Sequence, residues 1–306
     1  MSKIAFVFPG QGAQYPGMGK SIYENSKAAR ELFDKCEEIR PKTLATCFEG
    51  IEEELKQTAN TQTCLYLTGL GTALALNEQG IFADAVAGFS LGELCALSYA
   101  GSYSAEAGFR AVCERGILMQ EAAGENDTAM TAVLKASADV VEKICGEFEN
   151  VYPVNYNSPQ QTVVSGLKSE LELFKQRISQ EGFRCVDLAV SAAFHSPYMA
   201  NAAERFAPIL ENTDIRYPEI PVYSNTTGGI YPQDVRSTLC TQIKSPVKWT
   251  DTINNMINDG IEIFVETGTG KTLSGLIKRI APSAKIYTVN EYDDISKLVG
   301  EVNADA

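Results

Sequence analysis

The sequence predicts an α/β protein with an α/β-hydrolase-like parallel-sheet core and an inserted ferredoxin-like (βαββαβ) subdomain. Apolar runs that suit buried strands alternate with helix-like segments, which is typical of a parallel sheet covered by helices. A G-x-S-x-G pattern at 88–92 stands between a strand and a helix, as in the nucleophile turn of α/β-hydrolase sheets. A different order of elements over 128–191 predicts the inserted subdomain.

The first part of the chain supplies strands and helices of the predicted core. An apolar run ending in Pro-Gly at 3–10 predicts a buried strand, and 22–39 carries apolar residues at helical spacing. A longer apolar helix is expected at 60–80, where Gly80 provides the stop. The short strand at 84–90 leads directly into the next helix.

The middle of the chain predicts the order βαββαβ, which is the ferredoxin-like arrangement. The expected strands are 129–134, 151–157, 161–166 and 184–190, and the expected helices are 137–148 and 168–182. We therefore assign 128–191 to a ferredoxin-like subdomain, inserted into a catalytic domain formed by 1–127 and 192–306. The later elements expected are helices at 197–211, 233–244 and 250–259, a strand at 221–228, and a strand, Gly-rich turn and helix over 261–280.

The composition of the 306 residues excludes several function classes. The net charge of −13 argues against nucleic-acid binding, because contacts with phosphates need a basic face. The eight cysteines form no C-x-x-C pair and predict reduced, buried thiols, so we expect neither disulfides nor a metal site. No apolar run approaches the roughly 18 residues that span a bilayer, and the N-terminal apolar run is too short for a signal peptide. We expect a cytoplasmic monomer that binds no membrane.

Ser90, at the centre of the G-x-S-x-G pattern, is the candidate nucleophile. A serine at neutral pH needs a neighbouring base, and His195 is the only histidine in the chain. The backbone N–H of Leu91 and the glycine-flanked Gln11 are candidate donors to an oxyanion. The alternatives are that Ser90 only caps a helix, that His195 has no role, and that the Gln11 loop is simply a turn.

Seven segments match the pattern of one enzyme family, in order and over nearly the whole chain. They are FPGQGAQYPGMG (8–19), GFSLGE (88–93), ERGILMQEA (114–122), PVNYNSPQQTVVSG (153–166), FHSPYM (194–199), QIKSPVKW (242–249) and GKTLSGLIKRI (270–280). On these segments the sequence resembles the malonyl-CoA:acyl carrier protein transacylases, which are the acyltransferases of bacterial fatty-acid synthesis.

The resemblance implies a role for each matching residue of the catalytic site. Ser90 matches the nucleophile that becomes acylated, and His195 matches its base. Gln242 matches the residue whose backbone carbonyl holds the imidazole in this family. That carbonyl takes the place of the carboxylate of a catalytic triad. Gln11 and Leu91 match the oxyanion-hole positions.

The resemblance also implies how the acyl group is recognised. Arg115 matches the arginine that pairs with the free carboxylate of malonate, and a guanidinium suits a desolvated carboxylate because it donates two parallel hydrogen bonds. Without the family match, Arg115 reads as an exposed residue of a helix. Phe194 either walls the acyl pocket or packs in the core. Asn155 and Asn157 either face the cleft or cap strand ends.

The chain departs from the family pattern at two places. Phe89 stands where the family usually has histidine beside the nucleophile, so a polar contact in the acyl pocket is lost. Gly268-Thr269 replaces the usual Gly-Pro of a late turn. Malonyl remains the expected acyl group because Arg115 still supplies the charge.

The resemblance implies a ping-pong reaction with two substrates, malonyl-CoA and acyl carrier protein, and no cofactor bound by this chain. Acyl carrier proteins are acidic, so docking on this acidic chain needs a local basic patch. We expect the patch at Lys271, Lys278, Arg279 and Lys285, bordered by Lys244 and Lys248. The alternative is a solvated helix face.

Three other functions remain as rivals. A free-standing acyltransferase of a polyketide synthase would do the same chemistry on a different carrier. The G-x-S-x-G pattern by itself fits an esterase or thioesterase equally well, although a dyad without aspartate and an arginine for the acyl carboxylate argue against one. The third rival is an inactive scaffold, against which the intact Ser90, His195 and Arg115 argue.

Overall fold

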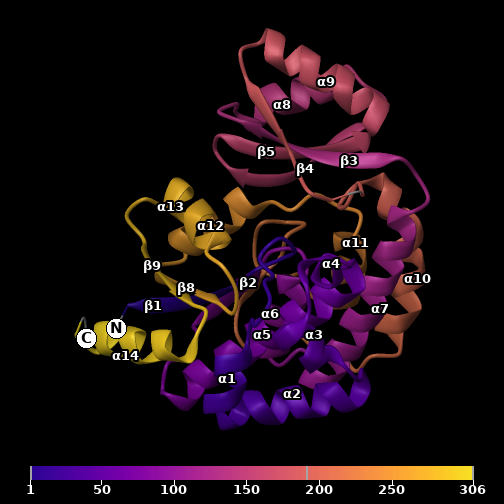
Figure 1. Ribbon diagram of the computed structural model, residues 1–306. Coiled ribbons are helices and arrows are strands. Elements are labelled where there is room, and N and C mark those ends of the chain that lie inside the picture. The colour runs from indigo at the N-terminus through magenta and orange to yellow at the C-terminus, as the bar shows by residue number, and fades with distance from the viewer. Residues whose placement is uncertain (1, 191, 305–306) are drawn as a thin grey trace.

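Two sheets organise the chain in the computed structural model, which describes residues 2–190 and 192–304. The first sheet has the strand order β7-β2-β1-β8-β9, and every neighbouring pair in it is parallel. The second sheet has the order β4-β5-β3-β6 and is antiparallel. Figure 1 shows the second sheet as a separate layer above the first, with its helices on the side away from the first sheet.

The parallel sheet is covered by helices on both faces. Its strands are β1 (Lys3–Phe8), β2 (Ala85–Gly88), β7 (Val222–Tyr223), β8 (Ile261–Thr267) and β9 (Lys285–Val289). Because side chains alternate along a strand, Phe6 and Phe8 face one core cluster, and Ala5 and Val7 face another. The first cluster contains residues of α2, α5, α6 and α7, and the second those of α12 and α13.

The helices outside the second sheet follow the chain in this order: α1 (Lys20–Asn25), α2 (Lys27–Ile39), α3 (Thr43–Glu49), α4 (Glu52–Leu55), α5 (Thr58–Glu78), α6 (Gly92–Tyr99), α7 (Ala105–Ala123), α10 (Ala200–Glu211), α11 (Val235–Gln242), α12 (Trp249–Asn258), α13 (Thr272–Ile280) and α14 (Tyr292–Ala304). A short 3-10 turn, Pro197–Met199, precedes α10. No described helix is both long enough and apolar enough to cross a membrane.

The second sheet has the predicted ferredoxin-like order. Its elements are β3 (Thr128–Leu134), α8 (Ala138–Cys145), β4 (Val151–Ser158), β5 (Gln161–Leu167), α9 (Lys168–Gln180) and β6 (Arg184–Asp187). Two backbone hydrogen bonds join β4 to the segment before α12: Tyr156 N–H to Val247 O at 2.9 Å, and Val247 N–H to Val154 O at 2.8 Å. The final residue that the sequence assigned to this unit, 191, lies outside the described residues.

The predicted fold class is confirmed, but two elements were predicted wrongly. The helix expected over 22–39 is split into α1 and α2, because Ser26 is extended (φ −111°, ψ 127°) and its side chain caps α2 by accepting from the Ala29 N–H. The strand expected over 221–228 is only β7, because the chain turns back after it, with Gly228 N–H donating to Ser224 O at 2.8 Å.

Other elements carried no sequence prediction. The short helices α3 and α4 fill the connection between α2 and α5, and β9 with α14 completes the edge of the parallel sheet. The expectation that the cysteines are buried is wrong for three of them, because Cys113, Cys185 and Cys240 are only half-buried, while Cys36, Cys47, Cys64, Cys95 and Cys145 are buried.

The carboxyl ends of three neighbouring parallel strands meet at one edge of the sheet. The loop after β1 carries Gln11, the turn after β2 carries Ser90, and the segment after β7 carries Asn225. Ligands of open α/β sheets bind outside this edge. The fold therefore brings these side chains together although they are far apart in sequence.

Close packing between β1 and α6 requires glycine at 92. A Cβ built on Gly92 would lie 2.0 Å from the carbonyl oxygen of Phe8, which is backbone and cannot move aside cheaply. We expect Gly92→Ala to lower the free energy of unfolding by about 1–3 kcal/mol or more, as measured by urea denaturation. The control is Gly275→Ala in α13, where a Cβ meets nothing within 4 Å and helix propensity should stabilise by about 0.5–1 kcal/mol. Equal stability of the two variants would contradict this account of the turn.

Candidate active site

Ser90 occupies a strained turn between β2 and α6. Its φ is +53°, in the left-handed region that residues with a side chain seldom adopt. The turn is fixed from below, because the Phe89 N–H donates to Phe8 O at 2.9 Å. The strain projects the serine side chain above the edge of the parallel sheet, at the start of α6.

His195 lies directly against Ser90. Its Nε2 is 2.7 Å from Ser90 Oγ, and its Nδ1 is 3.0 Å from the backbone carbonyl oxygen of Gln242. Because a carbonyl oxygen only accepts, Nδ1 carries the hydrogen and Nε2 is left free to accept the serine proton. His195 also has a left-handed backbone, with φ +60°. The pair is thus a serine and a histidine oriented by a neutral carbonyl.

The environment of His195 keeps its imidazole neutral. The ring is buried, and burial lowers its pKa to about 4, with the nearby positive charge of Arg115 acting in the same direction. The hydrogen bond to Gln242 opposes this shift but does not outweigh it. A neutral imidazole at neutral pH can accept a proton at once, which is what a general base requires.

Arg115 is a fully buried cation beside the serine. It extends from α7, and its Nη1 donates to Gln62 Oε1 at 2.7 Å. Its Nη2 donates to Gln242 Oε1 at 2.9 Å and lies 3.4 Å from Ser90 Oγ, while its Nε has no partner. Burial lowers its pKa to about 10, so it stays charged at neutral pH. Among the described residues, no carboxylate hydrogen-bonds to it, and its hydrogen-bond acceptors are neutral amide and hydroxyl oxygens.

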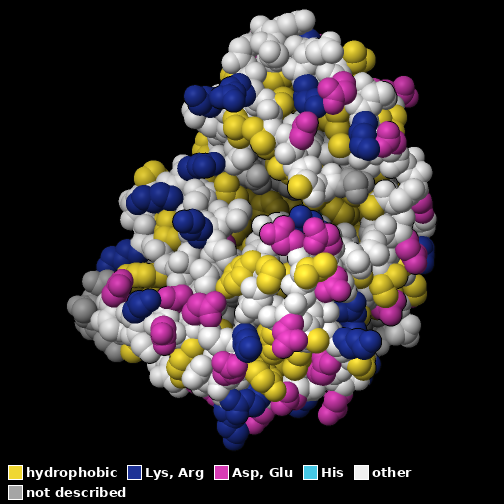
Figure 2. All heavy atoms as spheres, viewed as in Figure 1, with side chains coloured by type: hydrophobic (Ala, Val, Ile, Leu, Met, Phe, Trp, Pro, Cys, Tyr) yellow, Lys and Arg dark blue, Asp and Glu magenta, His cyan; other side chains and the backbone are white. Residues whose placement is uncertain are grey.

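A narrow cavity of about 90 Å³ opens over Ser90. It is lined by Gln11, Gln62, Phe89, Ser90, Leu91, Met119, Met130, Asn155, Leu188, Val190, Phe194 and His195. Figure 2 shows the molecule hollowed between its two layers, with hydrophobic side chains inside the hollow. The lining is mostly apolar, which suits a site that must keep water away from an ester.

The structure places most of the predicted site residues at this cavity. Gln11, Leu91 and Phe194 lie on its wall, and Gln242 stands behind His195. Asn155 lines it with a buried, unpartnered Oδ1. Asn157, on the same strand, does not line this cavity, although its Oδ1 is also buried without a partner.

Two wider cavities, of about 410 Å³ each, adjoin the narrow one. Both share Gln11 and Val190 with the cavity over Ser90, and both are bordered by Lys56 at the end of α4. Their shared lining places both of them beside the cavity over Ser90.

Phe89 fills the position beside the nucleophile with an apolar ring. The ring lines the cavity and packs edge-to-face on Trp249, with 5.6 Å between ring centroids and an interplanar angle of 62°. Trp249 is fully buried, and its Nε1–H has no partner. Because Phe89 stands at this position instead of a histidine, this wall of the pocket is apolar.

Sequence reasoning missed three polar residues that support the site. Gln62 holds Arg115, while Asn225 and Glu93 lie beneath the Ser90 turn. A signal for two of them was present, because Gln62 and Glu93 are polar residues within otherwise apolar helices, where buried polar groups need a reason. Asn225 follows a two-residue strand and left no such signal.

The predicted basic residues are spread along α13 and beyond it, with Lys278 and Arg279 in its last turn and Lys285 at the start of β9. Arg279 donates to Gln161 Oε1 of β5 at 3.1 Å, and Lys278 donates to Pro282 O at 2.7 Å. Lys271 precedes the helix. Figure 2 shows Lys and Arg side chains following one another down the left edge of the molecule, where Figure 1 draws α12 and α13.

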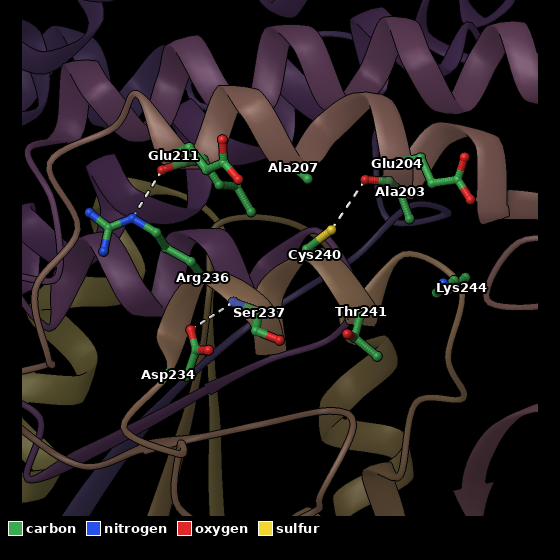
Figure 3. Close-up of a pocket in the computed structure, with 11 residues that line it drawn as sticks. Ala203, Glu204, Ala207, Glu211, Asp234, Arg236, Ser237, Cys240, Thr241 and Lys244 are labelled. Atoms are coloured by element: carbon green, nitrogen blue, oxygen red, sulfur yellow. Dashed lines mark hydrogen bonds between the residues drawn. The ribbon is translucent and has the colours of Figure 1, made fainter.

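A groove of about 420 Å³ lies apart from Ser90, between α10 and α11. Figure 3 shows that some of its polar groups are bonded to neighbours: Cys240 Sγ to Ala203 O at 3.1 Å, and Asp234 Oδ1 to the Ser237 N–H at 3.0 Å. Arg236 is likewise held by Leu210 O at 3.1 Å. No group of three or more His, Cys, Asp or Glu side chains suited to a metal occurs in the described part of the chain.

A serine that lines an apolar cavity, is hydrogen-bonded to a neutral histidine and lies 3.4 Å from a buried cation defines the class of enzyme that carries an acyl group on serine. Comparisons with known proteins narrow this class. A family model described as "Acyl transferase domain" matches residues 5–288. A malonyl CoA-acyl carrier protein transacylase of Bacillus subtilis is 39% identical and covers 98% of this chain and 97% of its own length.

Solved structures agree with the sequence match. The malonyl CoA-acyl carrier protein transacylase from Clostridium perfringens superposes with a TM-score of 0.96 at 34% identity, over 99% of this chain and 98% of that one. A structure described as a type II PKS acyl-carrier protein in complex with its malonyl-transacylase gives a TM-score of 0.93 at 32% identity. The match covers 98% of this chain and 100% of that one. The chain belongs to the acyl transferase family, among its malonyl CoA-acyl carrier protein transacylases, as the sequence segments predicted.

His195→Asn tests the role of the imidazole. Asparagine tolerates the left-handed backbone at 195 but cannot act as a base, so we expect Ser90 acylation in a single turnover with malonyl-CoA to slow by about 100- to 10,000-fold. The control is Tyr198→Phe, three residues after His195, which removes only a 3.3 Å hydrogen bond to Asn150. This variant should be acylated at the wild-type rate. A wild-type rate for His195→Asn would show that another group takes the serine proton.

Proposed function

We propose that the protein transfers a malonyl group from malonyl-CoA to the phosphopantetheine thiol of acyl carrier protein, through an acyl-enzyme at Ser90, and so supplies fatty-acid elongation. The observation that carries the proposal is the buried guanidinium of Arg115, whose Nη2 lies 3.4 Å from Ser90 Oγ while its Nε–H has no partner. An acyl group with its own carboxylate would supply the negative charge that hydrogen bonds to Gln62 and Gln242 do not give this cation.

In the first half-reaction, Ser90 attacks the malonyl thioester. His195 Nε2 takes the serine proton as Oγ bonds to the carbonyl carbon, and the oxyanion that forms is stabilised by N–H donors at Gln11 and Leu91. When the carbon–sulfur bond breaks, His195 returns the proton to the coenzyme A thiolate. The malonyl group is left as an ester on Ser90, with its carboxylate on Arg115.

In the second half-reaction, the carrier's thiol reverses these steps. His195 accepts the thiol proton, sulfur bonds to the ester carbonyl carbon, and Ser90 Oγ leaves with the proton. Each step exchanges one acyl ester for another of similar energy, so the reaction is reversible and calls for no cofactor or metal. The apolar cavity limits the loss of malonate to water.

Both substrates are proposed to reach Ser90 through the two wider cavities that adjoin it. Each brings a phosphopantetheine arm, so one channel serves both half-reactions. Asn155 and Phe194 border the acyl group, while Asn157 remains a proposed contact on the same strand. The carrier is proposed to dock on the basic patch of Lys271, Lys278 and Arg279.

We further propose that residues 1–127 and 192–306 act as the catalytic domain and 128–191 as the subdomain that closes over it. We propose a cytoplasmic monomer that binds neither membrane nor nucleic acid. Its eight free thiols fit a reducing compartment, and its net charge of −13 disfavours contact with nucleic-acid phosphates.

A polyketide carrier protein is the second candidate acceptor. The type II PKS complex, at a TM-score of 0.93, supports it, because the same fold serves that carrier. Side-by-side transfer assays with fatty-acid and polyketide carrier proteins distinguish the two: we expect kcat/KM to be higher for the fatty-acid carrier, and a higher value for the polyketide carrier would reassign the pathway.

Arg115→Met separates a malonyl enzyme from a general acyltransferase. We expect labelling of Ser90 by malonyl-CoA to fall by about 30-fold or more, because loss of a buried partner of a charge costs at least about 2 kcal/mol. Labelling by acetyl-CoA, which carries no free carboxylate, should not fall with it. An equal loss of labelling with both acyl groups would show that Arg115 does not recognise malonyl.

The wild type separates a transferase from a hydrolase. Its malonyl label should persist on Ser90 until carrier protein is added. Rapid release of free malonate without carrier would indicate a hydrolase instead.

The docking patch is tested by charge reversal at Lys278 and Arg279. We expect the double change to glutamate to raise the KM for carrier protein by roughly tenfold or more, because like charges at an interface repel. The malonyl-CoA half-reaction should be unchanged. Lys20→Glu with Lys27→Glu, on α1 and α2, alters the net charge equally and serves as the control. An unchanged KM for the carrier would rule the patch out.

A further inference from the structure

Glu93 is a buried carboxylate for which the acyl-transfer steps have no use. It lies in the first turn of α6 and is fully buried. Its Oε2 accepts the Asn225 N–H at 2.7 Å, and its Oε1 accepts the Tyr231 O–H at 2.6 Å. A charge enclosed in this way is costly, and an apolar side chain would often stabilise a core as well. Glu93 therefore calls for an explanation beyond packing.

Asn225 connects Glu93 to the nucleophile. Its Oδ1 accepts the Ser90 N–H at 2.7 Å, and its Nδ2 donates to Gly88 O at 2.6 Å. One amide side chain thus spans the turn on both sides of Phe89. The strained conformation of Ser90 persists only if its surroundings hold it, and these two bonds do so directly.

Gln242 joins the same network to the base. Its Nε2 donates to Ser90 O at 2.6 Å and approaches Asn225 Oδ1 at 3.4 Å, while its backbone carbonyl holds His195. The network thus contacts Ser90 through both its N–H and its carbonyl oxygen. Its one negatively charged member is Glu93, which also acts on Arg115 by opposing the effect of burial on the pKa of that guanidinium.

We propose that Glu93 is a positioning residue: through Asn225 it fixes the Ser90 turn so that Oγ stays in hydrogen-bond contact with His195. The inference rests on the proposed acyl-enzyme function, since it assumes that Ser90 is the nucleophile. It concerns the reactivity of the free enzyme, before any acyl group is bound.

The position of Glu93 makes its charge sensitive to pH near neutrality. Burial raises its pKa to about 7, against the opposing effect of its hydrogen bonds and of Arg115. The other titratable groups that face it stay outside this range: burial raises the pKa of Tyr231 and of Tyr103 well above the usual value, and the pKa of Arg115 is about 10. A protonated Glu93 accepts hydrogen bonds more weakly, so Ser90 should lose reactivity as the pH falls through about 7.

A fluorophosphonate tests the proposal, because it reacts with an activated serine and carries no acyl carboxylate. Ser90 Oγ bonds to phosphorus, the phosphorus–fluorine bond breaks, fluoride leaves, and His195 takes the proton. We expect Glu93→Gln to react about tenfold or more slowly than the wild type and to lose the pH dependence near 7. Tyr231→Phe, which removes one donor to Glu93 but leaves Asn225, should move the inflection to higher pH.

Glu266→Gln is the matched control. Glu266 is also a buried glutamate whose carboxylate accepts two N–H donors, from Leu273 at 2.9 Å and Ser274 at 2.7 Å, at the start of α13. The Glu266→Gln variant should have a lower melting temperature than the wild type and should react with the fluorophosphonate at the wild-type rate.

Each outcome decides the proposal. If Glu93→Gln reacts at the wild-type rate with the wild-type pH profile, Glu93 is only structural. If it does not fold, an unshifted inflection in Tyr231→Phe overturns the proposal equally well. A wild type that reacts with the fluorophosphonate but not with malonyl-CoA would defeat the proposed function and leave this inference standing.

Discussion

The hydrogen bond between Ser90 Oγ and His195 Nε2, 2.7 Å long, is the interaction on which the rest of the site depends. Both residues have left-handed backbones, so neither conformation is favourable without support from its neighbours. The support comes from Gln242, whose backbone carbonyl holds the imidazole and whose side-chain amide donates to the backbone carbonyl of Ser90. A carbonyl oxygen thus does the orienting that a carboxylate does in a triad.

The parallel sheet positions the reactive residues, and the second sheet lines the opposite side of the cavity. Loops after β1, β2 and β7 bring Gln11, Ser90 and Asn225 to one edge, and β3 and β4 contribute Met130 and Asn155 from above. Arg115 reaches the same point from α7 and brings a positive charge within 3.4 Å of the serine Oγ. In the proposed function, selectivity for a charged acyl group comes from this cation, because a guanidinium donates charge-assisted hydrogen bonds to a carboxylate and an uncharged acyl group offers it none of the same strength.

Much of this could be predicted from the sequence, for physical reasons that differ from element to element. The βαββαβ unit was predictable because the apolar residues of each element repeat at strand or helix spacing. The Ser90–His195 dyad was predictable because the chain has no other histidine. The break at Ser26 was not predictable, because Glu78, 52 residues away, accepts hydrogen bonds from the Ser26 hydroxyl at 2.6 Å and the Ala28 N–H at 2.8 Å. Glu93 escaped for the same reason, since its partner Asn225 lies 132 residues further on. The burial of Arg115 was likewise visible only once α7 was packed.

In the proposed reaction Ser90 carries a malonyl group whose carboxylate lies on Arg115. The most direct measurement is a crystal structure of the enzyme trapped with malonyl-CoA in the absence of carrier protein. The account predicts an ester on Ser90 Oγ, with the malonyl carboxylate about 3 Å from the Arg115 guanidinium and displacing none of the His195 contacts. An unmodified serine, or an ester whose carboxylate points away from Arg115, would contradict it.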